Sequence, residues 1–494
     1  MMSLLARGYS LVIVSLIENG VPFFRMLMLS RGLSLKELGF SSALAAAYGA
    51  FELITDFAVY RFVFSAPRDK YEEAMASAHA LSVLRGAVVG ALAAATAPFV
   101  ARALSLAAYW PDFAVLGLVV FIRSLEHLGP RVAEREYRYG AQLKVNIISN
   151  GMGLAALAAT LLATRSHLAL LASLLAQMTG QVVASHLSAD QPYRLKFRSP
   201  LFIEAFRFGY PLMFNGMGLA ASAHGDRLIV GALLGLPTLG VYAVATLATY
   251  LPISLIGRLA GTTLLAAFYN ATNLGGAVYQ ARVRFAACVV PAVSAVYAVS
   301  VLTLMNILVP LVFGPTFRLS AAAVAILALG CFFRLVRGDP FTSMLMQEGR
   351  TRRLAAANLA STTALAFELV LIFAFGTLES VLAGRLLGEL AGLGVMLTVT
   401  FNEFRPAFRE WVESLAFGLA VVCGATLLTF TTTVGEHLAI SAITLLACAG
   451  LCGLNAARTA IPLFRVAFPN QAESFGGRKF GAGGSEKNDD LERC

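Results

Sequence analysis

The chain has 494 residues, of which 58% are hydrophobic and 13% charged, and its formal net charge is +10. Soluble domains carry about 25% charged residues, so this composition and a mean hydropathy of +0.74 exclude an ordinary soluble protein. Apolar stretches of the about 20 residues needed to cross a bilayer recur along nearly the whole chain, which predicts an all-α polytopic membrane protein.

The hydropathy pattern predicts about fourteen transmembrane helices separated by short polar turns. In chain order, their expected ranges are 8–30, 40–66, 79–105, 112–131, 141–164, 167–187, 206–234, 238–268, 283–313, 319–347, 353–375, 379–401, 411–431 and 437–457. The first stretch is longer than the apolar core of a signal peptide and continues into a repeated unit. We therefore expect it to be retained as a helix.

Two stretches of the chain resemble each other about 200 residues apart, which indicates an internal duplication. When Gly39 is aligned with Gly240, Gly-Leu-Ser-Leu-Lys-Glu-Leu-Gly39 falls on Leu-Leu-Gly-Leu-Pro-Thr-Leu-Gly240, and Gly8-Tyr9 falls on Gly209-Tyr210. Because the copies begin about six helices apart, an even number, both cross the membrane in the same sense. The sequence therefore predicts two parallel six-helix lobes around a central cavity, with two extra C-terminal helices.

This duplication predicts five regions. They are an N-terminal six-helix lobe (1–190), a cytoplasmic linker (191–203), a C-terminal six-helix lobe (204–401), additional helices 13 and 14 (402–468) and a disordered cytosolic tail (469–494). The linker is basic. The tail is rich in Gly and charged residues and has too little apolar surface to fold alone.

Basic residues in the connections predict the orientation, because cytoplasmic loops retain positive charge during insertion. With a cytoplasmic N-terminus, the cytoplasmic connections hold most of the Lys and Arg residues. The outer connections then hold only Arg31, Lys36, Arg102, Arg165 and Arg318. Both termini are therefore predicted to be cytoplasmic, and the positive charge is explained without nucleic acid binding.

Several segments resemble bacterial polysaccharide and O-antigen flippases of the multidrug/oligosaccharidyl-lipid/polysaccharide exporter superfamily. In the second lobe they are Phe206-Arg-Phe-Gly-Tyr-Pro-Leu-Met213, Asp226-Arg-Leu-Ile-Val-Gly231 and Leu234-Gly-Leu-Pro-Thr-Leu-Gly-Val-Tyr-Ala243. In the first lobe they are Ser30-Arg-Gly-Leu-Ser-Leu-Lys-Glu-Leu-Gly-Phe40 and Pro130-Arg-Val-Ala-Glu-Arg-Glu-Tyr-Arg-Tyr139. The ordered set covers roughly residues 8–400.

The resemblance implies a transporter that moves a polyprenyl-diphosphate-linked oligosaccharide across the bacterial inner membrane by alternating access. Such a protein serves exopolysaccharide, capsule or O-antigen synthesis. Its partners would be the lipid-linked oligosaccharide and membrane lipid, with polysaccharide polymerase and export proteins as further candidates.

Ionisable residues inside helices are candidates for function, since each costs roughly 2.5–3.5 kcal/mol at mid-bilayer. Guanidinium groups bind phosphate oxygens in bidentate fashion and stay charged at working pH, which suits a diphosphate headgroup. The candidates for this anion site are Arg25, Arg123, Arg258 and Arg334. Glu52 and Asp56, four residues apart on one helix, are candidates for binding a coupling proton or sodium ion.

The same charges have simpler interpretations. Acids inside the helices nearly match arginines in number, so many of these groups are expected to pair with one another. Asp226 and Arg227 are interpreted as a feature of lobe packing, and Arg85 as a residue that snorkels toward the cytoplasmic surface.

The sequence predicts no cofactor or metal site. It contains no GxxxxGK[ST] phosphate loop, and its six cysteines form no CxxC pair. Transport is therefore expected to be secondary or substrate-driven.

Three other functions remain open. A lipid II flippase of peptidoglycan synthesis would share the helix count and a cationic cavity, whereas a multidrug cation antiporter of the same superfamily would favour an acid-dominated cavity. A membrane polymerase or ligase of lipid-linked sugars would present a sizeable or carboxylate-bearing outer loop, and none of the outer connections is long. We therefore expect a transporter and not an enzyme.

Overall fold

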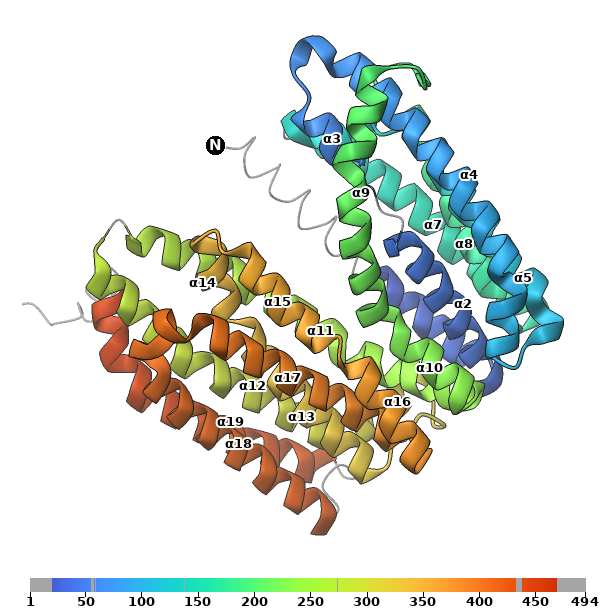
Figure 1. The fold of residues 1–494 in the computed structure, drawn as a ribbon. Helices are drawn as coiled ribbons and strands as arrows, with labels where there is room; N and C mark the ends of the chain where they lie inside the picture. Colours follow the sequence, from blue (N-terminus) through green and yellow to red (C-terminus); the bar gives the residue numbers. More distant parts are fainter. Residues whose placement is uncertain are drawn as a thin grey trace, which may run out of the picture.

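The protein was analysed in a computed structural model that describes residues 20–54, 57, 59–136, 138–272, 274–431 and 438–468. All regular secondary structure within these ranges is helical (Figure 1). Eleven segments of the described chain are long and apolar enough to cross a membrane, which confirms an all-α polytopic membrane protein. The count of fourteen is not confirmed, although one of the eleven, Leu378–Thr431, contains two successive helices.

The first half of the described chain forms one bundle. Residues 20–32 are helical and precede α2 (Leu35–Ile54), α3 (Val59–Ser65), α4 (Tyr71–Ala103), α5 (Trp110–Ser124), α6 (Gly129–Val132), α7 (Gly140–Thr164) and α8 (Leu168–Leu187). Residues 1–19, which hold most of the first predicted helix, lie outside the described residues.

The second half begins with α9 (Pro200–Ala220), the π-helical turn η4 (Ala221–Gly225) and α10 (Asp226–Leu233). It continues with α11 (Leu236–Thr272), α12 (Gly276–Phe313), α13 (Ala321–Gly338), α14 (Phe341–Gln347), α15 (Thr351–Ser361), α16 (Ala364–Phe375), α17 (Leu378–Phe404), α18 (Phe408–Thr431) and α19 (Leu438–Ala467).

Local signals explain several of these boundaries. At the start of α9, the Ser199 side chain accepts a hydrogen bond from the Leu201 amide, and Pro200 occupies the first helical position. Ser320 caps α13 by accepting a bond from the Ala323 amide. Gly376 ends α16 in the left-handed conformation, where a side chain would be strained.

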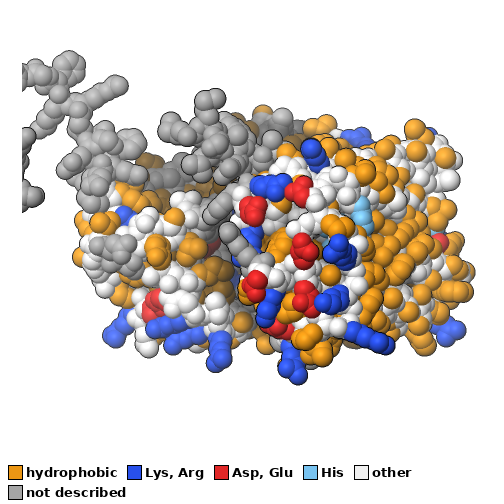
Figure 2. Space-filling view, turned by 90° about the horizontal axis from the view of Figure 1, so that it is seen from above, with side chains coloured by type: hydrophobic (Ala, Val, Ile, Leu, Met, Phe, Trp, Pro, Cys, Tyr) orange, Lys and Arg blue, Asp and Glu red, His pale blue; other side chains and the backbone are white. Residues whose placement is uncertain are grey.

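The two bundles diverge from one end of the molecule (Figure 1). Helices α2 to α8 form the first and α11 to α19 the second, and the bundles meet near α10. The end that carries residues 188–199 is called the linker end, and the other end the opposite end. Figure 2, seen from above Figure 1, shows acidic and basic side chains gathered on the upper face, with hydrophobic side chains along the flank.

The seventh predicted helix crosses between the bundles. α9 packs against α2, α3 and α4 of the first bundle, whereas α10 packs against α11 of the second and also against α2. The π-helical turn at Ala221–Gly225 separates these two halves, and such interruptions of a helix are often found at functional sites. The segment predicted to open the second lobe thus lies partly against the first.

Contacts near the opposite end hold the bundles together. Nε of Arg31 donates to the Val312 carbonyl at 2.8 Å, and its Nη2 donates to the Leu311 carbonyl, both near the C-terminus of α12. The rings of Phe23 and Phe313 also meet edge to face, with centroids 5.6 Å apart. The molecule is therefore closed at this end and its bundles diverge toward the linker end.

Helices α18 and α19 pack along α12. Nε of Arg284 donates to Glu410 of α18 at 2.8 Å, and Nε of Arg282 donates to the Ala467 carbonyl of α19 at 2.8 Å. The pair is thus fixed to the linker half of α12 and does not line the space between the bundles.

Candidate substrate cavity and intramembrane charge clusters

A cavity of about 760 Å³ lies in the second bundle. It is lined by the α9–α10 segment and by α13, α15, α16 and α17. Its charged lining residues are Asp226, Arg334, Arg337, Glu368, Arg385 and Glu389, and its neutral polar ones are Ser222, Thr351, Asn358, Ser361 and Thr362. We call this space the second-lobe cavity.

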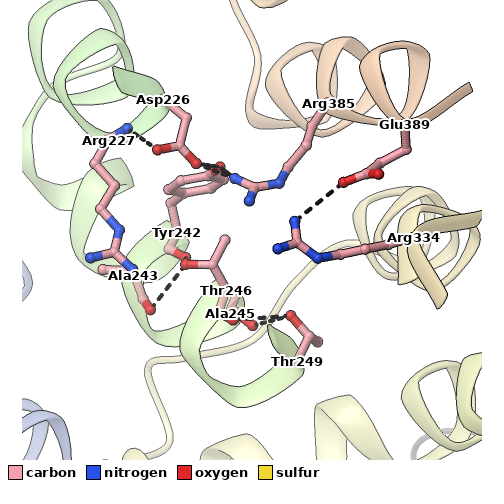
Figure 3. Close-up of polar contacts among 10 residues, drawn as sticks. All are labelled: Asp226, Arg227, Tyr242, Ala243, Ala245, Thr246, Thr249, Arg334, Arg385 and Glu389. Carbon is pink, nitrogen blue, oxygen red and sulfur yellow. Dashed lines mark hydrogen bonds and ion pairs between the residues drawn. The ribbon is translucent and has the colours of Figure 1, made fainter. Parts of the chain in front are cut away.

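Asp226 and Arg385 form one ion pair of this cavity (Figure 3). The Tyr242 hydroxyl donates to the same Asp226 oxygen at 2.6 Å and accepts a bond from Arg385 Nη1 at 3.0 Å. Asp226 is 3% exposed and Tyr242 is fully buried. The geometry satisfies the carboxylate locally and leaves it little capacity to attract a cation.

Glu389 holds the other two arginines. Its two oxygens accept from Nη1 of Arg334 at 3.2 Å and from Nε of Arg337 at 2.8 Å. The guanidinium groups of Arg334 and Arg385 also lie 4.8 and 4.4 Å from the ring centre of Tyr250. Tyr250 therefore links the two ion-pair groups through cation–π contacts.

Glu368 lies apart from these pairs. Its side chain is 1% exposed, and its Oε2 has no hydrogen-bond partner among the described residues. Gly384 permits the close approach of α16, because a Cβ there would lie 2.6 Å from the Glu368 Cα. With Glu368 included, the cavity has three acids and three arginines, so its formal charge is zero when all six are ionised.

A second cluster lies in the first bundle. Arg123 of α5 forms an ion pair with Glu52 of α2 and donates to the Tyr48 hydroxyl at 3.3 Å. A pocket of about 100 Å³ beside this pair is also lined by Arg85, Glu126 and Arg131. Its formal charge is +1, from three arginines against two glutamates. Arg85, expected to snorkel, is half-buried in this pocket.

Arg25 has a different environment. Its Nη2 donates to the Gln177 side-chain oxygen at 2.5 Å, and the Gln177 amide donates to Asn150 at 2.9 Å. Its Nε is buried without a hydrogen-bond partner among the described residues. No carboxylate in the described part of the chain forms an ion pair with Arg25, so its positive charge is held by neutral amides.

The predicted site residues do not converge on one pocket. Arg334 lines the second-lobe cavity, whereas Arg123 and Glu52 line the small pocket of the first bundle. Arg25 is also in the first bundle, where it is hydrogen-bonded to the Gln177 side chain. Arg258 is exposed on α11 and is not among the residues that line the cavities described above. Asp56 lies outside the described residues.

The expectation that internal charges pair with one another is confirmed for Arg123 and Arg334. Asp226, interpreted as a feature of lobe packing, is buried in an ion pair with Arg385 at the edge of the cavity. The pairing of these two residues was not predicted, since they are 159 residues apart in the sequence. The four-residue spacing of Arg385 and Glu389, which places both on one face of α17, was the signal for this site.

Comparisons with solved structures identify the fold. The chain is similar to a lipid II flippase MurJ in an inward closed conformation, with a TM-score of 0.65 and 12% identity over 91% of this chain and 99% of that one. It is also similar to an inward-facing multidrug resistance MATE family transporter of the MOP superfamily, with a TM-score of 0.57 and 12% identity over 84% and 98% of the chains. These likenesses show a shared architecture.

No curated protein matches the chain by sequence. Residues 28–322 match the model of a family described as polysaccharide biosynthesis protein. The match covers more than half of the chain, and this protein therefore belongs to the polysaccharide biosynthesis protein family.

Proposed function

We propose that the protein is a flippase that moves a polyprenyl-diphosphate-linked oligosaccharide across the bacterial inner membrane, with both termini in the cytoplasm. The observation that carries the proposal is Arg25, a half-buried cation held only by neutral amides in the described chain. An intramembrane charge without an opposite charge is costly, and an anionic ligand relieves that cost. The family and the likeness to a lipid II flippase support the same class of substrate.

The two-bundle arrangement supports alternating access. The bundles are joined at the opposite end and diverge toward the linker end, which the positive-inside rule places in the cytoplasm. In this state, a lipid-linked sugar enters from the cytoplasmic leaflet. Rocking of the bundles about their joined end would then expose it to the periplasmic side.

Arg123 would contribute by exchanging partners, whereas Arg334 stays paired with Glu389. Arg123 is bound to Glu52, and two oxygens of a diphosphate offer a guanidinium the same bidentate geometry as a carboxylate. When Arg123 binds phosphate, Glu52 loses its cation and becomes able to take up a proton or sodium ion. We propose this exchange as the coupling step. Arg258 takes no part in this exchange, because it is exposed on α11 and lines neither pocket.

The charge of the described pockets favours this proposal over a cation antiporter. The second-lobe cavity is formally neutral and the first-bundle pocket carries +1, so neither has the acidic excess that would concentrate a cationic drug. A lipid II flippase remains the second candidate, because its substrate carries the same lipid diphosphate.

A cell-based experiment tests the function. In a strain that lacks the protein, lipid-linked oligosaccharide is expected to accumulate in the cytoplasmic leaflet, and the wild-type gene is expected to restore its transfer. Arg25→Gln is expected to restore little transfer, whereas Arg102→Gln, at an exposed position on α4, is expected to restore it fully. Unchanged sidedness in the deletion strain would overturn the proposal, and resistance to cationic drugs as the only phenotype would favour the antiporter.

A further inference from the structure

Five of the six ionisable side chains that line the second-lobe cavity are already paired with one another, which leaves no free arginine to bind an anion. The three arginines and two of the three acids are paired within the wall, through Asp226 with Arg385 and through Glu389 with Arg334 and Arg337. A charged ligand would have to break one of these buried pairs and leave the other charge unpaired. A neutral polar ligand would leave the pairs intact.

Two buried polar atoms of the lining remain unsatisfied. Arg385 Nε is a donor without an acceptor, and Glu368 Oε2 is an acceptor without a donor, among the described residues. A buried polar group that makes no hydrogen bond destabilises the fold. Hydroxyl groups donate and accept at once, so a ligand rich in hydroxyls has the chemistry to satisfy both atoms once the side chains that shield them shift.

The remaining wall presents more groups of this kind. The hydroxyls of Ser361 and Thr362 donate to backbone carbonyls at 2.7 and 2.6 Å, which leaves their oxygen lone pairs as acceptors. Asn358 accepts a bond from Arg337 at 3.0 Å, which fixes the amide and leaves its NH₂ group as a donor. Donors and acceptors that lie close together at the end of α15 and in the following turn match the hydroxyls of a sugar ring.

From these observations we infer that the second-lobe cavity is a subsite for uncharged sugar rings of the lipid-linked oligosaccharide. Its volume of about 760 Å³ lies within the range of about 300–1,000 Å³ of small-ligand sites. The cavity therefore suits an oligosaccharide unit and is too small for a long polymer. The inference rests on the proposed function and adds a division between lobes: Arg25 binds the diphosphate, and the second-lobe cavity binds the glycan.

The test uses full-length protein in detergent and two probes, polyprenyl diphosphate and the same lipid carrying a neutral oligosaccharide. The informative variant combines Asn358→Ala with Thr362→Val, because neither side chain is buried and folding is expected to be preserved. Thr398→Val is the matched control, since Thr398 is exposed on α17 and is not among the residues lining the cavity. Binding is measured by native mass spectrometry or by ligand-dependent thermal shift.

We expect the double variant to weaken binding of the glycan lipid about tenfold or more and to leave binding of bare polyprenyl diphosphate unchanged. Arg25→Gln should weaken both probes, and Thr398→Val neither. Equal binding of the glycan lipid to wild type and double variant would overturn the glycan subsite while the function stands. If wild-type protein binds neither probe, the proposed function fails, and the subsite with it.

Discussion

Gly39 of α2 and Gly240 of α11, which are aligned with each other in the predicted repeat, each face the backbone of the other helix. A Cβ on Gly39 would overlap the Leu236 carbonyl oxygen, and a Cβ on Gly240 would lie 2.7 Å from the Leu35 carbonyl oxygen. Leu35 and Leu236 are themselves equivalent under the same alignment. The contact is therefore reciprocal, as expected across a pseudo-two-fold axis, and it lies close to the end where the bundles are joined.

Adding a methyl group at this crossing should destabilise the closed end. Gly39→Ala places the methyl against a backbone carbonyl, which only a shift of the helices relieves, and overpacking of this kind costs about 1–3 kcal/mol. The expected result is a lower Tm of the purified protein together with slower transport. Gly257→Ala on α11 is the control, because a Cβ there meets nothing within 4 Å. An unchanged Tm in both variants would show that the helices have room for a methyl group at this crossing.

Removing one partner of the Asp226–Arg385 pair should be strongly destabilising. Arg385→Gln leaves the buried Asp226 carboxylate with Tyr242 as its side-chain donor, and loss of one partner of a buried pair costs about 3–5 kcal/mol. Asp226→Asn combined with Arg385→Gln should cost less than the sum of the single changes, as measured by denaturant unfolding in detergent. Arg409→Ala, which breaks an exposed pair with Glu413, should produce no measurable change. Additive effects of the two buried changes would contradict the pairing.

The hydrogen bonds of Arg31 should keep the two bundles joined at the opposite end. Its guanidinium binds the last carbonyls of α12, where the helix dipole favours a cation. Arg31→Ala should increase labelling of a Ser30→Cys variant by a membrane-impermeant maleimide several-fold, because Ser30 is buried in this state. Arg102→Ala, also predicted at the outer surface, should leave the labelling rate unchanged. Equal labelling rates of Ser30→Cys alone, with Arg31→Ala and with Arg102→Ala would show that Arg31 does not keep this end closed.

Three histidines secure the linker at the other end. His127 Nδ1 accepts a bond from the Gly129 amide at 2.9 Å, so its Nε2–H donates to the Gln191 carbonyl of the linker at 2.9 Å. The rings of His79 and His186 lie 4.7 and 5.5 Å from the ring of His127. Burial, and then the nearby His186, lower the pKa of His127 from 6.5.

A lowered pKa gives this docking a defined pH dependence. The unfolded state binds more protons than the folded one below about pH 6.5, so the stability contributed by neutral His127 is complete above that pH and declines as pH falls. Trypsin cleavage at Arg194, Lys196 and Arg198 should accelerate between pH 7.5 and 5.5, after normalisation to an unstructured peptide. His127→Gln, which cannot be protonated, should remove most of this acceleration. If cleavage of His127→Gln depended on pH as cleavage of the wild type does, a group other than His127 would be responsible for the acceleration.

The sequence was sufficient to predict the helical membrane fold. Composition and hydropathy require spanning helices, and eleven segments of the described chain are long and apolar enough to cross a membrane. The two glycines that the predicted repeat aligns, Gly39 and Gly240, also lie against each other's helices. The sequence also predicted that intramembrane charges pair with one another, because an isolated charge in this environment is costly.

Which residue each intramembrane charge pairs with was not predictable from the sequence. Asp226 and Arg385 are 159 residues apart, and Arg123 and Tyr48 are 75 apart, so each contact depends on which helices become neighbours. The position of Arg258 was not predictable for the same reason. Helix α11 is 37 residues long, and which of its faces is exposed depends on the helices that pack against it. The crossing of α9 to the first bundle likewise depends on tertiary packing that the repeat does not encode.

Transfer by the purified protein in proteoliposomes tests the central claim most directly. The measured quantity is the rate at which a polyprenyl-diphosphate-linked oligosaccharide, loaded in one leaflet, becomes accessible to a sugar-modifying enzyme on the other side. We predict rapid transfer with wild-type protein and Arg102→Gln, and at least a tenfold lower rate with Arg25→Gln. Transfer no faster than in protein-free liposomes, or an Arg25→Gln rate equal to that of wild type, would contradict the account.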